Sequence, residues 1–169
     1  MLEKQVKTVF ISIGSNLGNK KRNIELAKFE LKINYINIIK SSSYYETFSW
    51  PDKTKPKFIN VVLKTETYLY PNDLMKKFLN IEKKLGRKRN KKNEPRIIDI
   101  DIIDYDNKIL KKNLNNNLSL PHPKMHKRNF VLLPLFEVSK IWIHPVKNTS
   151  LKNLINSLKI EELRAIKLL

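Results

Sequence analysis

The sequence predicts an α+β fold in which an antiparallel sheet is flanked by helices. Segments typical of strands and of helices follow one another in the order strand, helix, strand, strand, helix, strand, and further helices come after them. The connection between the second and third strands is proline-rich and too short for a crossover helix, so the strands cannot all be parallel. A βαββαβ order with this constraint predicts a ferredoxin-like core.

The first strand and the first helix are predicted from the spacing of their apolar residues. Residues 6–13 alternate in polarity and are rich in β-branched side chains, which indicates a buried strand that ends in a glycine-containing turn. Leu26, Phe29 and Ile33 are three and four positions apart. We therefore expect a helix over residues 20–34 with these three side chains on its buried face.

Two strands and a second helix follow. Residues 36–48 and 58–67 are predicted as strands, and the prolines between them mark residues 51–56 as irregular. The second helix has four apolar residues at helical spacing, a proline in its first turn and a glycine cap, namely Leu74, Phe78, Ile81 and Leu85 with Pro71 and Gly86.

The last part of the chain contains one more strand and two helices. Residues 98–105 are predicted as a strand, and the residues that follow it, 107–117, are predicted as a long mobile connection rich in Asn and Lys. Residues 130–138 and 151–158 are predicted as helices, the second capped by Ser150.

Length and composition exclude several classes of protein. The 169 residues fit one domain, which we expect to span residues 1–169. No apolar run approaches the roughly 20 residues of a membrane span, and the first residues lack the pattern of a secretory signal. Without cysteine the chain forms no disulfide and no thiolate site. We therefore expect a cytoplasmic protein without a membrane partner.

The chain is strongly basic, with 34 Lys and Arg, 16 Asp and Glu, and a net charge of +18. Such an excess attracts polyanions, including nucleotides and nucleic acids. A tolerant surface under A/T-rich coding drift would give the same composition, and both explanations stay open. The positions of the charges are therefore more informative than their sum.

Asp99 and Asp101 are the strongest local signal for chemistry. Strand side chains alternate, so these two carboxylates share one face while Ile98, Ile100 and Ile102 pack on the other. Neighbouring carboxylates repel each other unless a cation lies between them, and Mg²⁺ is a hard cation that binds few carboxylates together with phosphate oxygens. A solvent-facing strand with two charges is the alternative interpretation.

A cationic loop precedes the two aspartates and favours the metal-binding interpretation. Within residues 83–96 Glu94 is the only acid, beside eight basic residues: Lys83, Lys84, Arg87, Lys88, Arg89, Lys91, Lys92 and Arg96. Phosphoryl transfer needs such a combination, because metal and arginines together neutralise the transferring group. A merely solvated basic loop is the alternative.

A second candidate is the segment around His122, which lies between two prolines and six residues before Arg128. His122 could donate to a phosphate, with Arg128 adding charge, although in isolation a capped loop before a helix explains the pattern as well. The glycines of residues 14–18 lack the Lys-Ser/Thr of a Walker loop, which excludes the commonest nucleotide-binding architecture.

Taken together, these segments resemble the 6-hydroxymethyl-7,8-dihydropterin pyrophosphokinase family of folate synthesis. The resemblance covers residues 6–137, and its motifs occur in the family's order: IGSNLG at 13–18, SSYYET at 42–47, FIN at 58–60, IEKKLGRKR at 81–89, PRIIDID at 95–101 and PHPKMHKRNF at 121–130. The chain departs from the family in having Asn93-Glu94 where Trp-Gly is common, and in having Phe48, Ser49 and Pro51 after Thr47.

The resemblance implies a ferredoxin-like monomer that binds MgATP and then the pterin, with no nucleic acid partner. The pterin hydroxyl would attack the β-phosphorus of ATP and give AMP and the pterin diphosphate. By motif position Asp99 and Asp101 would hold two Mg²⁺ ions, and Arg87 and Arg96 would assist transfer. The expected ATP-binding residues are Glu82, Arg89, Lys92, Arg96, Ile102, Ser119, His122 and Arg128. The expected pterin-binding residues are Thr47, Phe48, Trp50, Phe58, Asn60 and Phe130.

The residues agree with this division between the two substrates. A flat heterocycle is bound by aromatic faces and a few placed polar groups, and Phe58 with Asn60 offers both on one strand. An amide satisfied within the core is the alternative for Asn60. Two other functions are alternatives. One is a basic RNA-binding domain, whose sheet would normally display aromatics. The other is an inactive relative, which would be expected to have lost Asp99, Asp101 or Arg96.

Overall fold

A computed structural model describes residues 5–88, 93–113 and 117–169. The larger sheet contains β1 (Lys7–Ser15), β2 (Asn37–Ser41), β3 (Tyr45–Thr47), β4 (Phe58–Thr67), β5 (Asp99–Tyr105) and β8 (Ile166–Leu168). A small hairpin contains β6 (Ile143–His144) and β7 (Thr149–Ser150). The helices are α1 (Lys20–Ile33), α2 (Pro71–Lys84), η1 (Met125–Lys127), α3 (Asn129–Val138), α4 (Leu151–Asn156) and α5 (Ile160–Arg164).

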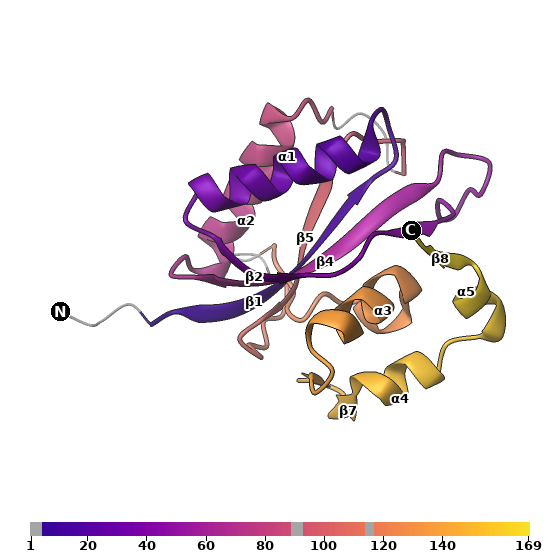
Figure 1. Cartoon of the computed structure of the whole chain (residues 1–169). Helices are drawn as coiled ribbons and strands as arrows, with labels where there is room; N and C mark the ends of the chain where they lie inside the picture. Colours follow the sequence, from indigo (N-terminus) through magenta and orange to yellow (C-terminus); the bar gives the residue numbers. More distant parts are fainter. Residues whose placement is uncertain (1–4, 89–92, 114–116) are drawn as a thin grey trace.

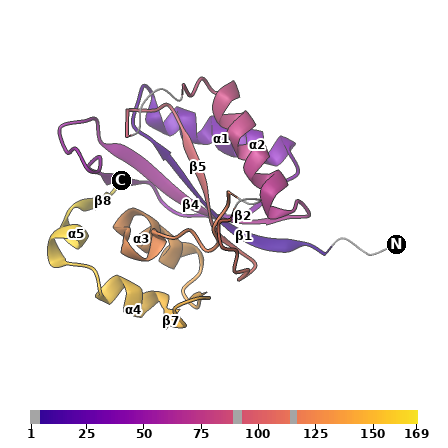
Figure 2. The same cartoon turned by 180° about the vertical axis from the view of Figure 1, so that it is seen from behind.

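The predicted architecture is confirmed. The strand order is β5-β1-β4-β3-β8, with β2 also on β4, and each pairing is antiparallel. The helices α1 and α2 cover one face of the sheet, while α3 and α4 lie on the other side (Figure 1 and, from behind, Figure 2). This is the topology of a ferredoxin-like core with an additional layer. None of the helices in the described ranges is long and apolar enough to cross a membrane.

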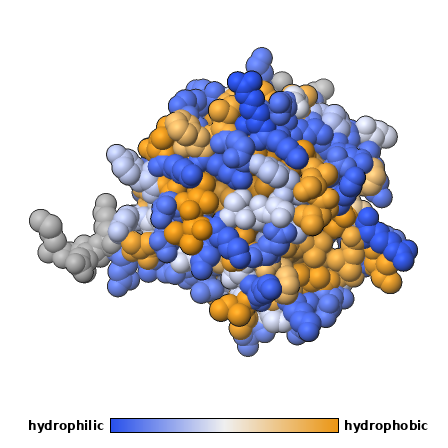
Figure 3. Space-filling view, in the orientation of Figure 1, coloured by the Kyte–Doolittle hydropathy of each residue, from blue (hydrophilic) through white to orange (hydrophobic). Residues whose placement is uncertain are grey.

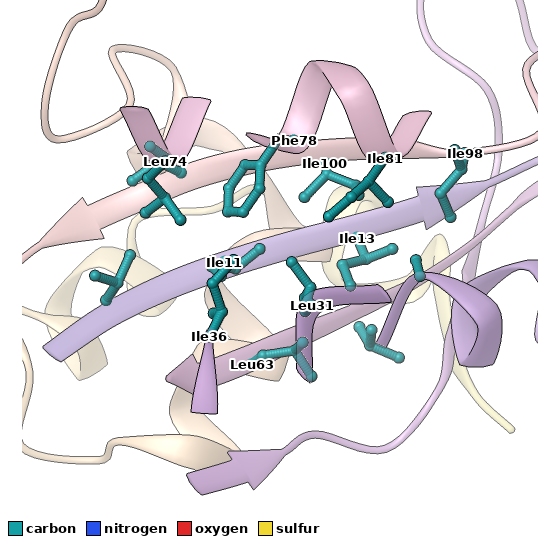
Figure 4. Close-up of a cluster of buried hydrophobic side chains, with 14 of the residues drawn as sticks. Ile11, Ile13, Leu31, Ile36, Leu63, Leu74, Phe78, Ile81, Ile98 and Ile100 are labelled. Carbon is teal, nitrogen blue, oxygen red and sulfur yellow. The ribbon is translucent and has the colours of Figure 1, made fainter. Parts of the chain in front are cut away.

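Two apolar cores lie on opposite faces of the sheet. Figure 4 shows the first, in which Ile11 of β1 and Leu63 of β4 face Leu31 of α1 and Phe78 of α2. The second core packs α3, α4 and Trp142 against Phe10, Val62 and Ile103. Burial of each large apolar side chain stabilises the fold by about 1.5–3 kcal/mol. Because both faces are covered, β1 is buried from Val9 to Ser15.

The second helix follows the sequence prediction closely. Pro71 occupies its first turn, and Leu74, Phe78 and Ile81 face the core. Gly86 adopts φ +94°, which favours glycine and ends the helix. This ending places Arg87 directly at the C-terminal end of α2.

The first helix forms as predicted, but its expected buried face is wrong. Leu26, Phe29 and Ile33 are exposed, with Phe29 at 58 % of its full accessibility. The buried stripe consists instead of Ile24, Ala27, Glu30 and Leu31. The Nζ of Lys84 on α2 pairs with the Glu30 carboxylate at 2.7 Å, which allows this charge to lie between the helices. Apolar patches interrupt the polar surface on the side where α1 faces the viewer (Figure 3).

The predicted strand over residues 36–48 is in fact two strands. The side chain of Ser42 accepts a hydrogen bond from the Val62 N–H at 2.9 Å, and the Ser42 N–H donates to the Val62 carbonyl at 2.9 Å. Because a side chain replaces a backbone acceptor, the regular ladder is interrupted there. β2 and β3 therefore pair with different parts of β4.

The C-terminal part was only partly anticipated. α3 and α4 match the predicted helices, and the Ser150 side chain caps α4 by accepting from the Asn153 N–H at 3.2 Å. The predicted long connection after β5 is tied back to itself by a bridge between Leu110 and Leu120. Helix α5 and strand β8 carried no sequence prediction.

Candidate active site

Asp99 and Asp101 lie on the face of β5 opposite Ile100 and Ile102, whose side chains belong to the first core. The Asp99 carboxylate accepts one hydrogen bond from Arg87 Nη1 at 2.5 Å and another from Arg96 Nη2 at 2.6 Å. Burial alone would raise the Asp99 pKa, but Arg96 and Arg87 outweigh it and hold the pKa below its usual value. Asp99 is therefore an ionised carboxylate between two arginines.

Arg87 is fixed in place by the end of α2. Its N–H donates to the Glu82 carbonyl at 2.9 Å, and its Nη1 contacts Glu82 Oε1 at 2.5 Å. Glu82 is buried and its Oε1 also accepts from the Ile100 N–H at 2.8 Å. Glu82, which is predicted to bind ATP, joins α2 to β5 and orients Arg87.

Asp101 has a different environment from Asp99. Among the described residues none donates a hydrogen bond to Asp101 or forms an ion pair with it. Burial, followed by the negative charge of Asp99, raises the Asp101 pKa to about 7. A half-buried carboxylate beside a second one, with no ion pair to any of the described residues, fits the needs of a divalent cation bound through oxygen. The donor set of Asp99 and Asp101 is thus compatible with Mg²⁺.

His122 and Arg128 add a basic flank to the two aspartates. The His122 N–H donates to the Ile103 carbonyl at 2.8 Å, so this segment runs beside β5. Burial and then Arg128 lower the His122 pKa to about 4, which keeps the imidazole neutral. Burial lowers the Arg128 pKa, an effect opposed by the charges of Asp101 and Asp99. Both predicted residues therefore lie close enough to the acidic pair to interact with its charge.

Two other residues predicted for ATP, Ser119 and Ile102, belong to the segments that contain His122 and Asp101. Ser119 is half-buried and directly precedes the bridge residue Leu120. The side chain of Ile102 is buried in the core, so any contact with a nucleotide falls to its backbone. Arg89 and Lys92, also predicted for ATP, lie outside the described residues.

Asn60 and Gly14 face each other where β1 and β4 pair, and Asn60 places a buried amide there. Asn60 is buried, and its Nδ2 donates to Thr47 Oγ1 at 3.0 Å. Gly14 lies opposite Asn60 in the ladder. A Cβ at position 14 would lie 2.8 Å from Asn60 Oδ1 and 3.4 Å from the Phe58 ring, so only glycine leaves these side chains in place.

Phe58 and Phe130, the aromatic residues predicted to stack on the pterin, each contact an arginine that lies near Asp99 and Asp101. The Arg96 guanidinium lies 5.1 Å from the Phe58 ring centroid, and Arg128 lies 5.5 Å from that of Phe130. In the described part of the chain these two rings do not contact each other. The residues predicted for a flat ring and for phosphate are therefore joined through Arg96 and Arg128.

Two residues predicted for the pterin are exposed. Trp50 is 74 % exposed. Phe48 is exposed and carries the Lys57 ammonium 4.8 Å from its ring centroid. The loop between β3 and β4 thus exposes both aromatic side chains, and their predicted contact with the pterin stays a prediction.

Asn16 has a structural role for which its local sequence gives no signal. Its Oδ1 accepts from the Arg96 N–H at 2.7 Å, and its N–H donates to the Arg96 carbonyl at 3.2 Å. Its Nδ2 donates to Ser49 Oγ at 3.2 Å and to the Pro56 carbonyl at 3.1 Å. Asn16 therefore connects both ends of the β3–β4 loop to the backbone of Arg96. The spacing of the glycine-rich turn at residues 14–18 carries no information about such distant partners.

Comparisons with known proteins agree with this geometry. Residues 10–140 match the model of the family described as 7,8-dihydro-6-hydroxymethylpterin-pyrophosphokinase (HPPK). The 2-amino-4-hydroxy-6-hydroxymethyldihydropteridine pyrophosphokinase of Aquifex aeolicus is 38% identical over 145 residues, which cover 86% of this chain and 88% of that protein. The folic acid synthesis protein fol1 of Pneumocystis carinii is 39% identical over 145 residues, 86% of this chain.

The lengths of these relatives differ. The match covers only 19% of the Pneumocystis protein. A crystal structure of Plasmodium falciparum HPPK-DHPS with pterin and p-hydroxybenzoate has the same fold, with a TM-score of 0.75 at 16% identity over 99% of this chain and 48% of that one. The matches give no support to an RNA-binding domain. On the extent of the family match and the identity to the Aquifex enzyme, this chain belongs to the 7,8-dihydro-6-hydroxymethylpterin-pyrophosphokinase family.

Proposed function

We propose that this chain, as a pyrophosphokinase of folate synthesis, transfers the diphosphate of ATP to the hydroxymethyl group of 6-hydroxymethyl-7,8-dihydropterin. The observation that carries the proposal is the contact of Arg96 with both Asp99 and Phe58. One side chain thereby joins the acidic site, which suits metal and phosphate, to the aromatic site, which suits a flat ring. Such a junction is required where a group passes from a nucleotide to a heterocycle.

Arg96, Arg128 and His122 would bind the triphosphate. Arg96 Nε is buried and has no hydrogen-bond partner among the described residues, so a donor is free for a phosphate oxygen. His122 Nδ1 accepts from the Lys124 N–H at 3.2 Å, which leaves the proton of the neutral imidazole on Nε2. Nε2–H is then a second donor for phosphate.

Asp99 and Asp101 would hold Mg²⁺, two ions as the family resemblance implies. When bound, Mg²⁺ offsets the charge of the phosphate oxygens during transfer. Arg87, held by Glu82, keeps Asp99 ionised and oriented. Ionisation of Asp101 is unfavourable without a cation, so metal binding and its deprotonation are coupled.

The pterin would lie between Phe58 and Phe130, with its polar edge toward Asn60. Because Asn60 Nδ2 is engaged by Thr47, the amide is held in a single orientation. The substrate hydroxyl oxygen would form a bond to the β-phosphorus of ATP while the bond from that phosphorus to the bridging oxygen of the α-phosphate breaks. The products are AMP and the pterin diphosphate, and the hydroxyl proton is released.

Product analysis tests this proposal directly. The protein is incubated with ATP, Mg²⁺ and the hydroxymethyl-dihydropterin, and the nucleotides are separated by chromatography. We expect AMP to form in equal amount to the pterin diphosphate, and only when all three components are present. Formation of ADP, or AMP that is independent of the pterin, would contradict the proposal.

A further inference from the structure

The C-terminal segment, residues 159–169, contacts two elements of the proposed pterin site although it lies beyond the family match. β8 pairs antiparallel with β3, with Thr47 opposite Ile166 and Glu46 opposite Lys167. The Leu169 N–H extends this pairing to the Tyr44 carbonyl at 2.9 Å. Both views place the C-terminal end beside the β3 edge of the sheet (Figures 1 and 2).

The same segment also holds the start of α3, where Phe130 lies. The Asn129 side chain donates through Nδ2 to the Glu162 carbonyl and accepts through Oδ1 from the Phe130 N–H at 2.7 Å. The Lys159 N–H donates to Glu162 Oε2 at 3.1 Å, which closes the first turn of α5. Leu163 packs against the second core, as Phe130 does. Asn129 therefore bridges α5 to the first turn of α3.

These contacts affect the groups that would orient the pterin. β3 has only three residues, and a short strand at a free edge is weakly held. With β4 on one side and β8 on the other, Thr47 is fixed by two ladders. Thr47 Oγ1 in turn fixes the Asn60 amide. The pairing of β8 with β3 therefore influences the orientation of Asn60 through one hydrogen bond, from Asn60 Nδ2 to Thr47 Oγ1.

We infer that the C-terminal segment is a positioning element for the pterin, an inference that rests on the proposed function. Through β8 it sets the orientation of Asn60, and through Asn129 it sets that of Phe130. Its described hydrogen bonds to other elements run to Tyr44, β3 and Asn129. None of them reaches the two aspartates or the arginines of the proposed nucleotide site, Arg87, Arg96 and Arg128. Loss of the segment's contacts therefore weakens pterin recognition and leaves nucleotide recognition unchanged.

A pair of substitutions at one exposed position separates this role from general stability. Lys167→Pro removes a backbone N–H from β8 and disfavours its pairing, whereas Lys167→Ala keeps the backbone and loses the same side chain. We expect the proline variant to raise the KM for the pterin about tenfold, as loss of an oriented hydrogen bond does. The KM for ATP should stay within about twofold, and the alanine variant should match wild type in both constants.

A second variant tests the bridge to α3 without altering β8. Asn129→Ala loses both the N–H that donates to Glu162 and the oxygen that accepts from the Phe130 N–H, and it adds no charge beside Arg128. We expect the pterin KM to rise about threefold to fivefold at constant KM for ATP. This variant also keeps the inference testable if Lys167→Pro does not fold, which thermal unfolding would show.

The outcomes distinguish the inference from the function on which it rests. An inactive wild-type protein would contradict the proposed function, and the inference with it. An active wild type would leave the function standing. If Lys167→Pro then lost stability but kept its pterin KM, or raised both KM values equally, the segment would be merely structural and the inference would be wrong.

Discussion

Asp99→Asn and Asp101→Asn are predicted to change the stability of the metal-free protein in opposite directions. Burial and Asp99 raise the Asp101 pKa from its usual 3.8 to about 7. Because the pKa is higher in the folded state than in the unfolded state, the folded protein loses stability as the pH rises through this interval. One pKa unit corresponds to about 1.4 kcal/mol, so the loss approaches about 4 kcal/mol above pH 7.

Replacement of Asp101 by Asn removes this loss, because the amide has no charge to bury. We therefore expect Asp101→Asn to be more stable than wild type by about 2–4 kcal/mol at pH 8, and by much less at pH 4. Asp99→Asn deprives Arg87 and Arg96 of their shared counterion. Removal of one partner from a buried ion pair costs on the order of 3 kcal/mol.

Urea unfolding in the presence of a chelator, at several pH values between 4 and 8, measures both effects. The two variants control for each other, since they carry the same substitution two residues apart on one strand face. A stabilisation by Asp101→Asn that did not depend on pH would show that charge burial is not its cause. Stabilisation by Asp99→Asn would refute the ion-pair assignment.

Three further predictions concern other parts of the site. Gly14→Ala should raise the pterin KM about tenfold in steady-state assays, because its Cβ would lie 2.8 Å from Asn60 Oδ1; an unchanged KM would mean that Asn60 does not face the substrate. The His122 pKa is lowered to about 4, so protonation destabilises the fold by up to about 3 kcal/mol as the pH falls from 6.5. Urea unfolding at pH 4.5 and 7 should show that the free energy of unfolding falls less with pH for His122→Gln than for wild type. An equal fall in both proteins would show that protonation of His122 does not cause the destabilisation. Arg96→Lys should lower kcat about 100-fold with less than about fivefold change in pterin KM, and the reverse pattern would assign Arg96 to pterin binding alone.

Spacing alone was sufficient for the helices and strands that have one apolar face. In α2 the apolar residues, the first-turn proline and the terminal glycine all agree, and the structure confirms each of them. In α1 two stripes have helical spacing, one through Leu26 and Phe29 and the other through Ile24 and Leu31. The choice between them depends on packing against α2, where Lys84 neutralises the buried Glu30. That partner lies 54 residues away and leaves no local signal.

In the candidate site too, features that depend on neighbouring residues could be predicted from the sequence, and contacts between residues far apart in the chain could not. Alternation along a strand predicted that Asp99 and Asp101 share a face. It did not predict that Arg87 and Arg96 both pair with Asp99, whereas Asp101 forms no ion pair within the described ranges, because this depends on how α2 ends. Asn16 illustrates the limit most clearly, since its partner Arg96 is 80 residues away in the chain.

Binding of a nucleotide analogue to wild type and Asp101→Asn tests the central claim most directly. An ATP analogue with a methylene group between the α- and β-phosphorus cannot transfer its diphosphate, so calorimetry reports binding alone. We predict that wild type binds the analogue only with Mg²⁺, and that Asp101→Asn loses this magnesium dependence together with most of the affinity. Equal, magnesium-dependent binding by both proteins would contradict the account of the two aspartates as the metal site.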